Sequence, residues 1–440
     1  MIVKNGAATL ARCLESARNL VDDIVIGDTG SDDATGAIAR DYGARIVNVP
    51  WNNDFSQARN AVLQHGAADW VLSLDADEML DSEASAAIPP LLSRENVWGY
   101  EVAIWNYVRS LATRFWDRPA KPNPGRVQAS VAYPAYLEHR NVRLFRRHLE
   151  IRFENRVHEG VADSLARKGY ETASASFVIH HFGIAEDDAA TRARKVELYQ
   201  ALGREKIREA PDDALAHFEL GIGELEHFRN PAAALACFQR VVELNPRSPR
   251  GWTFAGICLV RLGRHRAGLE QLQHAQHLGA GGAVLLEAQG DAFYHLENIQ
   301  EARNCYRAAR EQGGQSAILE SKLGVCEVRL GFAGQGLGYI ADAIAREPES
   351  PELHDILVTT ALLAGDLVLA AKAVNRRLAL GKLTPEVFLI AARIQVRMGD
   401  WVRVQQTLQD AYAHFPGEEK LHLAMAEVSK LTPAAADCAR

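Results

Sequence analysis

The sequence lacks the features of several large classes of protein. No apolar run approaches the length of about eighteen residues that a membrane-spanning helix needs. The net charge of −7 provides no basic surface for nucleic acid or for an anionic membrane. The six cysteines have no CxxC spacing, so we expect reduced packing residues. Residues 1–5 turn polar at once, so we expect no signal peptide and a cytoplasmic location.

The motifs of several common sites are also missing. The turn at 28–33 has neither the GxGxxG of a Rossmann dinucleotide site nor the GxxxxGK[ST] of a P-loop. No second His follows His158-Glu159 at the spacing of an HExxH zinc protease. The Gly-rich basic loop that a nucleotidyltransferase would need after the first strand is absent. The sequence therefore argues against all four.

The sequence does contain an alternation of strands and helices over residues 1–80. A hydrophobic content of 48% and a length of 440 residues indicate a globular protein of about two or three domains. Short apolar runs predict strands, separated by helices, at 1–3, 23–28, 45–49 and 70–74. This order predicts a right-handed parallel sheet that is covered by helices and has its fourth strand at 70–74.

Carboxylates follow two of these strands. Asp28 ends the second strand, and Asp75 and Asp77 follow the fourth with one residue between them. Alternation along an extended chain would point Asp75 and Asp77 the same way, at the edge where parallel sheets bind ligands. Two like charges this close favour a cation between them, and oxygen ligands suit Mg²⁺ or Mn²⁺. These residues suggest a nucleotide-diphosphate donor site, with a solvated turn as the alternative.

Several ordered motifs resemble one enzyme family. They are MIVKN at 1–5, RCL at 12–14, DIVIGDTGSDD at 23–33, FSQARN at 55–60, LDADE at 74–78, RLFR at 143–146 and VHE at 157–159. Together they look like a family-2 glycosyltransferase of the GT-A fold, over residues 1 to about 185. The resemblance implies an α/β nucleotide-diphospho-sugar transferase domain with a mostly parallel sheet between helices.

The resemblance also assigns residues to the nucleotide-sugar donor. Asp28 would bind the base, Arg59 would lie near the nucleotide, and Asp75 would approach the ribose. Val3 and Asn5, from the first motif, would belong to the same pocket. The donor is expected to be a UDP-sugar.

A divalent cation and a general base complete the implied site. Asp77 would hold the cation, Mn²⁺ or Mg²⁺, helped by Asp75 and by His181 at the end of a late strand. Either Glu159 or His158 could take the proton from the acceptor, with Glu159 preferred as a carboxylate that is ionised at neutral pH. A structural His-Glu pair at the domain edge is the alternative.

The sequence departs from the family pattern at its start. The family has several more strand residues before Met1 and a Glu where Gly6 stands, so either the true start lies upstream or this copy is damaged. Residues 110–135 hold Pro119, Pro122, Pro124 and Pro134 among basic and aromatic residues. This loop predicts a lid or an acceptor-binding segment, with a disordered insertion as the alternative.

After residue 190 the strand signals vanish and a period of 34 residues appears. The positions that repeat are Gly256, Gly290 and Gly324; Gly263, Glu297, Gly331, Gly365 and Gly399; and Ala275, Ala309 and Ala343. Such a period looks like tetratricopeptide repeats. We expect a transferase domain at 1–188, a linking helix at 189–212, an all-α solenoid of about six units at 213–431 and a tail at 432–440.

The two parts together predict a metal-dependent inverting glycosyltransferase. It would move a sugar from a nucleotide-diphospho-sugar to a protein, peptide or envelope-glycan acceptor that the repeats present. A protein partner could also occupy the concave face of the repeats, with a spacer or a dimerisation surface as alternatives. The competing function is an inactive transferase domain that rides on a protein-binding repeat scaffold.

Overall fold

The computed structural model describes residues 1–111, 113–115 and 118–431. The predicted tail at 432–440, with Cys438, lies outside the described residues, as does part of the predicted loop at 110–135. The chain forms two compact units, of which the first comprises Met1–Gly263 and His277–Gly279 and the second comprises the remainder. The other five cysteines are free, and no described helix is long and apolar enough to cross a membrane.

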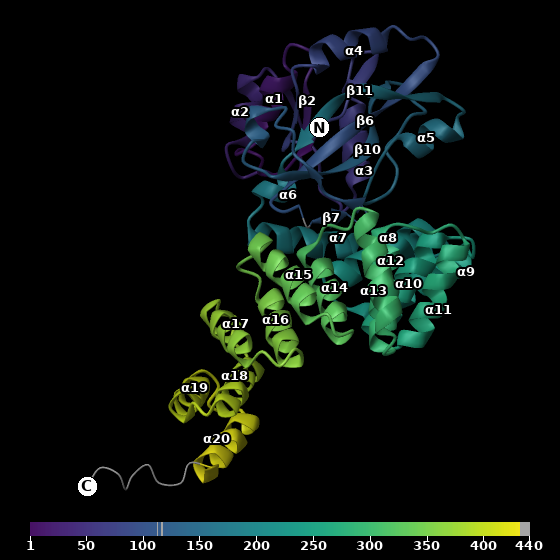
Figure 1. Ribbon diagram of the computed structural model, residues 1–440. Coiled ribbons are helices and arrows are strands. Elements are labelled where there is room, and N and C mark those ends of the chain that lie inside the picture. Colours follow the sequence, from purple (N-terminus) through teal and green to yellow (C-terminus); the bar gives the residue numbers. More distant parts are fainter. Residues whose placement is uncertain (112, 116–117, 432–440) are drawn as a thin grey trace. The chain divides into compact units, whose positions relative to one another are not determined.

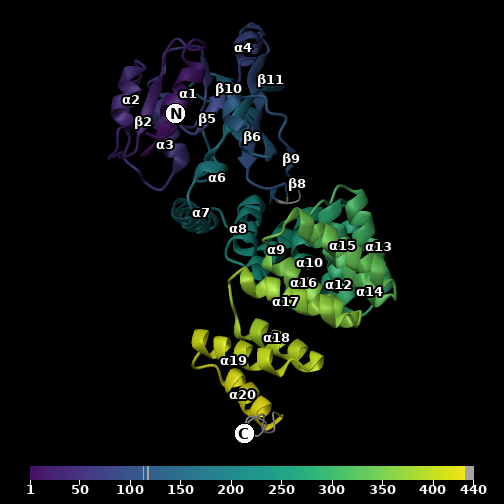
Figure 2. The same ribbon diagram turned by 60° about the vertical axis from the view of Figure 1, so that its left-hand side comes forward.

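Three short strands begin the first unit as a parallel sheet. In sheet order they are β1 (Ile2–Val3), β2 (Val25–Asp28) and β3 (Arg45–Asn48). The segments that connect these strands and follow them contain α1 (Leu10–Ala17), α2 (Thr35–Asp41) and α3 (Phe55–Leu63), which surround β2 in Figure 2. Leu10 and Leu14 of α1 lie on one helical face and are buried against Ile26 of β2. The first three predicted strands are therefore confirmed.

The fourth strand does not extend this sheet as predicted. β4 (Trp70–Leu72) pairs antiparallel with β10 (Ala135–Arg146), with Leu72 opposite Leu144. β1 has only two residues, whereas β10 has twelve and so offers β4 a complete ladder with apolar cross-strand pairs. The predicted α/β class is confirmed, but the expected single parallel sheet is wrong, because the described strands of this region form separate sheets.

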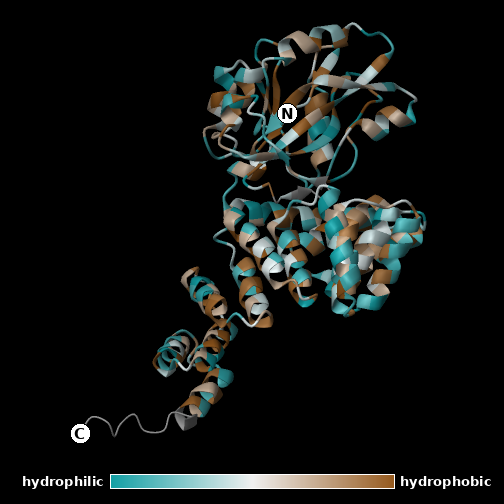
Figure 3. Ribbon diagram, viewed as in Figure 1, coloured by the Kyte–Doolittle hydropathy of each residue, from teal (hydrophilic) through white to brown (hydrophobic). Residues whose placement is uncertain are grey.

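The second sheet positions the site. Its strand order is β4, β10, β6 (Val97–Val108), β11 (Glu171–His181) and β5 (Glu78–Leu80), with β9 (Lys121–Pro122) beside β10. β11 runs parallel to β6 and antiparallel to β5, so that His181 lies opposite both Asn106 and Glu78. Tyr100, Ile104 and Ile179 are fully buried in this sheet, whose strands carry both hydrophobic and hydrophilic residues in Figure 3.

Short elements complete the α/β region (Figure 1). They are β7 (Arg114–Phe115), β8 (Arg118–Pro119), a 3₁₀ turn (Gln128–Ser130), α4 (Ala84–Leu92), α5 (Ala162–Arg167) and α6 (Gly183–Glu186). α4 packs on β11, and α5 packs on β6 and β11. β7 and β8 pair with each other in the predicted loop.

Helices make up the rest of the described chain. Those of the first unit are α7 (Ala189–Glu209), α8 (Ala214–Glu226), α9 (Pro231–Leu244) and α10 (Pro249–Arg261). Then follow α11 (His265–His277), α12 (Ala283–His295), α13 (Ile299–Glu311), α14 (Ala317–Arg329), α15 (Ala333–Arg346), α16 (Pro351–Leu363), α17 (Leu367–Ala379), α18 (Pro385–Met398), α19 (Trp401–His414) and α20 (Glu419–Leu431). The predicted run of helices is confirmed.

The 34-residue period has a direct structural cause. Gly263, Glu297, Gly331, Gly365 and Gly399 each end a helix with a positive φ, of 76°, 62°, 94°, 78° and 74°. Glycine adopts this left-handed conformation without strain, whereas other residues do not. A Cβ at Gly290 would lie 2.5 Å from the Tyr306 ring, and one at Gly324 would lie 2.5 Å from the carbonyl oxygen of Gly336. The repeat thus combines a left-handed turn with a close helix crossing.

Glu297 is the residue other than glycine among these five turn positions, so a substitution here should stabilise the fold. Replacing Glu297 by Gly should raise the free energy of unfolding by about 1 kcal/mol, because a left-handed residue with a Cβ is strained. The ion pair from Glu297 to Arg329 is exposed and contributes little. Chemical denaturation of the full chain measures the change as a shift of the midpoint.

Two control variants separate strain from charge. Glu297→Gln removes the charge but keeps the strain, so its midpoint should stay close to that of the wild type. Gly331→Ala introduces the strain at the equivalent turn and should lower the midpoint. A midpoint that falls in Glu297→Gly would contradict the account.

Candidate active site

A buried network of ion pairs surrounds Asp75. Arg59 of α3 donates from Nη2 to Asp75 Oδ1 and from Nε to Glu159 Oε1, both at 2.6 Å. Arg143 of β10 lies 3.3 Å from Asp75 Oδ2 and 2.8 Å from Glu78 Oε1. Burial alone would raise the pKa of Asp75, but the charges of Arg59 and Arg143 outweigh it and hold this pKa well below its usual range. Asp75 is therefore ionised, and both its oxygens are engaged.

The FSQARN segment folds so that Arg59 enters this network. Asp54 caps the start of α3 by accepting a hydrogen bond from the backbone N–H of Gln57 at 2.9 Å. Asn60 donates to the carbonyl oxygen of Phe153 and accepts from its N–H, both at 2.9 Å. This pair of bonds fixes the segment that leads to Glu159 against α3. Asn60 is thus a positioning residue that the sequence did not reveal.

Asp77 faces His181 beside this network. Asp77 Oδ2 lies 3.3 Å from His181 Nε2. Burial lowers the pKa of His181, but the charge of Asp77 outweighs this effect and raises the pKa to about 9. A Cβ added at Gly183 would overlap Asp77 Oδ2 and lie 3.0 Å from His181 Nε2. The HFG sequence at 181–183 therefore provides the imidazole and leaves space beside it.

Asn106 orients the imidazole of His181. Its Nδ2 donates to the carbonyl oxygen of Leu137 at 3.2 Å, so its Oδ1 faces His181 Nδ1 at 2.5 Å. His181 Nδ1 therefore carries a proton, and Nε2 is the nitrogen that points to Asp77. An imidazole held in this way through its far nitrogen is typical of metal-ligating histidines.

The residues predicted to hold the nucleotide form a second group. Val3 lies opposite Asp28 across β1 and β2. Asn5 Oδ1 accepts the N–H of Asp32, and Asp28 Oδ1 accepts the N–H groups of Gly30 and Ser31, so this turn is tightly folded. A Cβ added at Gly6 would lie 3.3 Å from the Cβ of Ala76. The turn that follows β1 therefore packs against the segment that carries Asp75 and Asp77.

Two of the three predicted metal ligands remain available for a cation in this geometry. Within the described residues, no group of three or more His, Cys, Asp or Glu side chains is arranged to hold a metal ion. Asp75 faces two arginines, so Asp77 and His181 are the predicted ligands that remain available. Mg²⁺ and similar ions in phosphate-transfer sites use one or two protein ligands and complete their shell with substrate phosphates and water. The pair fits a cation of this kind if the cation displaces the proton from His181 Nε2, because a ligating histidine must be neutral. Asp75 as a third ligand stays a prediction.

The two predicted bases have different surroundings. Glu159 is largely buried, and Arg59 engages its Oε1. His158 is exposed with a φ of 56°, and its ring lies 6.2 Å from that of Tyr199 on α7. Tyr199 was missed because no local motif marks it. The roles of Arg143 and Glu78 were also missed, although both lie in quoted motifs.

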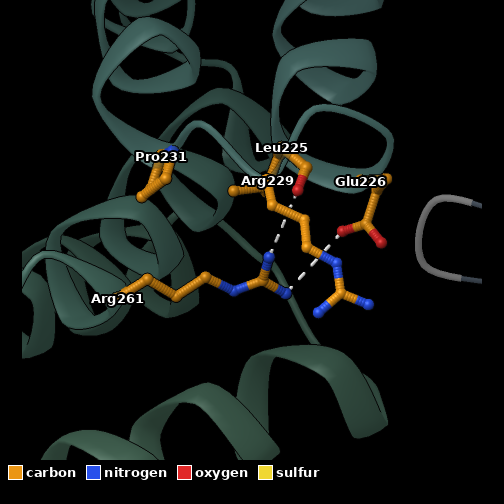
Figure 4. A pocket seen from close by; sticks show the side chains of 5 residues that line it. All are labelled: Leu225, Glu226, Arg229, Pro231 and Arg261. Atoms are coloured by element: carbon orange, nitrogen blue, oxygen red, sulfur yellow. Dashed lines mark hydrogen bonds and ion pairs between the residues drawn. The ribbon is translucent and has the colours of Figure 1, made fainter. Parts of the chain in front are cut away.

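A separate pocket lies among the helices of the first unit (Figure 4). It has a volume of about 400 Å³ and is lined by Leu225, Glu226, Arg229, Pro231 and Arg261. Arg261 donates to the carbonyl oxygen of Leu225 at 3.5 Å and lies 3.7 Å from Glu226. The pocket includes none of the predicted site residues.

Comparison with protein families identifies both parts of the chain. Residues 1–149 match the model described as Glycosyl transferase family 2, and residues 228–283 match the model described as Tetratricopeptide repeat. The N-terminal region is therefore a family-2 glycosyltransferase domain, and tetratricopeptide repeats follow it. The predicted family resemblance is confirmed.

Similar curated proteins carry names from both families. The chain is 33% identical over 227 residues to a TPR repeat-containing protein of Synechococcus elongatus, covering 50% of each chain. It is 35% identical over 96 residues to an uncharacterized glycosyltransferase of Rickettsia felis, covering 22% of this chain and 34% of the relative. It is 24% identical over 161 residues to the SPbeta prophage-derived glycosyltransferase SunS of Bacillus subtilis, covering 36% and 33%. The matches span half or less of the length of these relatives.

Gly183 provides a test of the space beside Asp77 and His181. In Gly183→Ala the added methyl group should push the two side chains apart and weaken Mn²⁺ binding by about tenfold. Calorimetric titration of Mn²⁺ in the presence of UDP measures this change. Gly338→Ala, where a Cβ meets open space, is the matched control and should bind as the wild type does. Equal affinities in both variants would rule out this role for Gly183.

Proposed function

We propose that the protein is a metal-dependent inverting glycosyltransferase that uses a nucleotide-diphospho-sugar, most simply a UDP-sugar. The observation that carries the proposal is the Asp77–His181 pair, which lies beside the Arg59–Asp75 network of a region matched to the family-2 glycosyltransferases over residues 1–149. Relatives named as glycosyltransferases support the enzyme class.

The donor would bind across the two groups of residues. Val3, Asn5 and Asp28 would hold the nucleoside, and Asp75 would approach the ribose from the fixed position that Arg59 gives it. Asp77 and His181 would hold a divalent cation, Mn²⁺ or Mg²⁺. When bound, the cation neutralises the charge that develops on the leaving diphosphate.

The chain would also activate the acceptor. Glu159 is our preferred base, because Arg59 fixes its position through Oε1, and no described hydrogen bond engages Oε2. His158 is the alternative. Either group would take the proton from the acceptor hydroxyl or thiol as the acceptor attacks the anomeric carbon. The acceptor would be a protein, peptide or envelope glycan that the repeats help to present.

The proposed role of Asp77 in cation binding is tested by measuring the turnover of a UDP-sugar. Asp77→Asn keeps the shape of the side chain but removes its charge, and should lower the hydrolysis or transfer of a UDP-sugar by at least about a hundredfold. A screen of UDP-glucose, UDP-galactose and UDP-N-acetylglucosamine identifies the donor for this assay. Asp163→Asn, an exposed carboxylate of the same domain, is the control and should retain full turnover.

Two outcomes would decide against the proposal. Unchanged turnover in Asp77→Asn would exclude the role of Asp77. A folded wild-type protein that turns over no nucleotide-sugar and binds no UDP would favour the inactive domain on a repeat scaffold.

A further inference from the structure

Helix α7 has local contacts at its start and an ion pair to the α/β region at its end. Asp188 caps its start by accepting the N–H of Thr191 at 2.6 Å. Lys195 pairs with Asp187 at 2.7 Å near that end, and Arg156 pairs with Glu209 at the other. The Arg156–Glu209 pair therefore connects the helix expected to act as a linker with the segment that leads to Glu159.

The aromatic ring of Tyr199 lies on the side of α7 that faces the site. Its centroid is 6.0 Å from that of Phe55 and 6.2 Å from that of His158, while Phe55 in turn lies 4.8 Å from Trp51. Tyr199 remains 43% exposed. The four rings therefore form an aromatic wall that continues from α3 to α7, and part of the Tyr199 ring is open to a ligand.

The Tyr199 hydroxyl lies close enough to the carboxylates of the site to be affected by their charge. Burial and the negative charge of Glu159, with smaller effects of Asp75 and Asp77, raise the pKa of Tyr199 to about 12. No described hydrogen bond engages this hydroxyl. Tyr199 thus presents an apolar ring and an unused polar group next to the predicted base.

This combination matches one class of ligand. A pyranose ring has an apolar face of C–H groups and an edge of hydroxyls, and pockets that combine aromatic rings with a few polar groups fit such ligands. The nucleoside is assigned to Val3, Asn5 and Asp28, at the β1 and β2 ends of the domain. The aromatic wall is therefore available for the acceptor.

We propose that α7 forms one wall of the acceptor subsite, where Tyr199 stacks on a pyranose ring and its hydroxyl bonds a sugar hydroxyl. The acceptor would then be a glycan or a glycosylated molecule, delivered within reach of Glu159 or His158. This inference rests on the proposed glycosyltransferase function and specifies its acceptor. The helix that joins the transferase domain to the repeats would then contribute directly to substrate binding.

The test uses simple glycosides as probes of the full-length protein. Saturation-transfer NMR with UDP and Mg²⁺ measures contact with methyl β-D-glucopyranoside, methyl β-D-galactopyranoside and methyl N-acetyl-β-D-glucosaminide. In wild-type protein at least one probe should receive saturation at its ring C–H protons. Tyr199→Leu, which keeps apolar volume but removes the ring, should lower this signal by at least about threefold.

Further variants make the test specific. Tyr199→Phe keeps the ring and should retain most of the saturation transfer. Tyr412→Ala removes a tyrosine of similar exposure on α19 and should match the wild type. UDP affinity, measured by calorimetry, shows that each variant retains its donor site.

The outcomes separate the two proposals. A wild-type protein that binds UDP but none of the probes, or a Tyr199→Leu variant with the full wild-type signal, overturns the acceptor subsite and leaves the proposed function standing. A wild-type protein that binds neither UDP nor any probe overturns the proposed function and the subsite with it.

Discussion

One arginine between two carboxylates organises the candidate site. Arg59 is almost completely buried, and it joins Asp75 from the β4–β5 connection to Glu159 from the segment after β10. A buried guanidinium must be paired, so removal of either carboxylate would leave an uncompensated charge. The positions of Asp75 and Glu159 are therefore linked. Asp75 and Asp77 look equivalent in the sequence, but they have different partners in the structure. Asp75 pairs with Arg59 and Arg143, whereas Asp77 pairs with His181.

The second sheet explains why Asp77 and His181 form a pair. The register of β11 places His181 opposite Asn106 and Glu78, and Asp77 directly precedes Glu78 in the chain. Asn106 then orients the imidazole, and Gly183 leaves the space that a side chain would occupy. Backbone pairing thus brings together residues that are about a hundred positions apart, a feature typical of sites at strand ends in α/β proteins.

Much of this architecture could be predicted from the sequence, because it depends on local patterns. Apolar runs located the first three strands, and the 34-residue period located the helical turns, including the strained position of Glu297. The partner of β4 and the pairing of Arg143 with Asp75 depend on contacts between residues 68 or more positions apart, which no local pattern encodes. Tyr199 could not be predicted for the same reason, because it lies on a helix that the sequence predicts to be only a linker.

The central claim is that Asp77 and His181 make nucleotide binding depend on a divalent cation. Calorimetric titration of the wild-type protein with UDP, once with Mn²⁺ and once with EDTA, tests this claim most directly. The account predicts saturable binding with Mn²⁺ and an affinity at least about tenfold weaker with EDTA. Equal affinity under both conditions would contradict it.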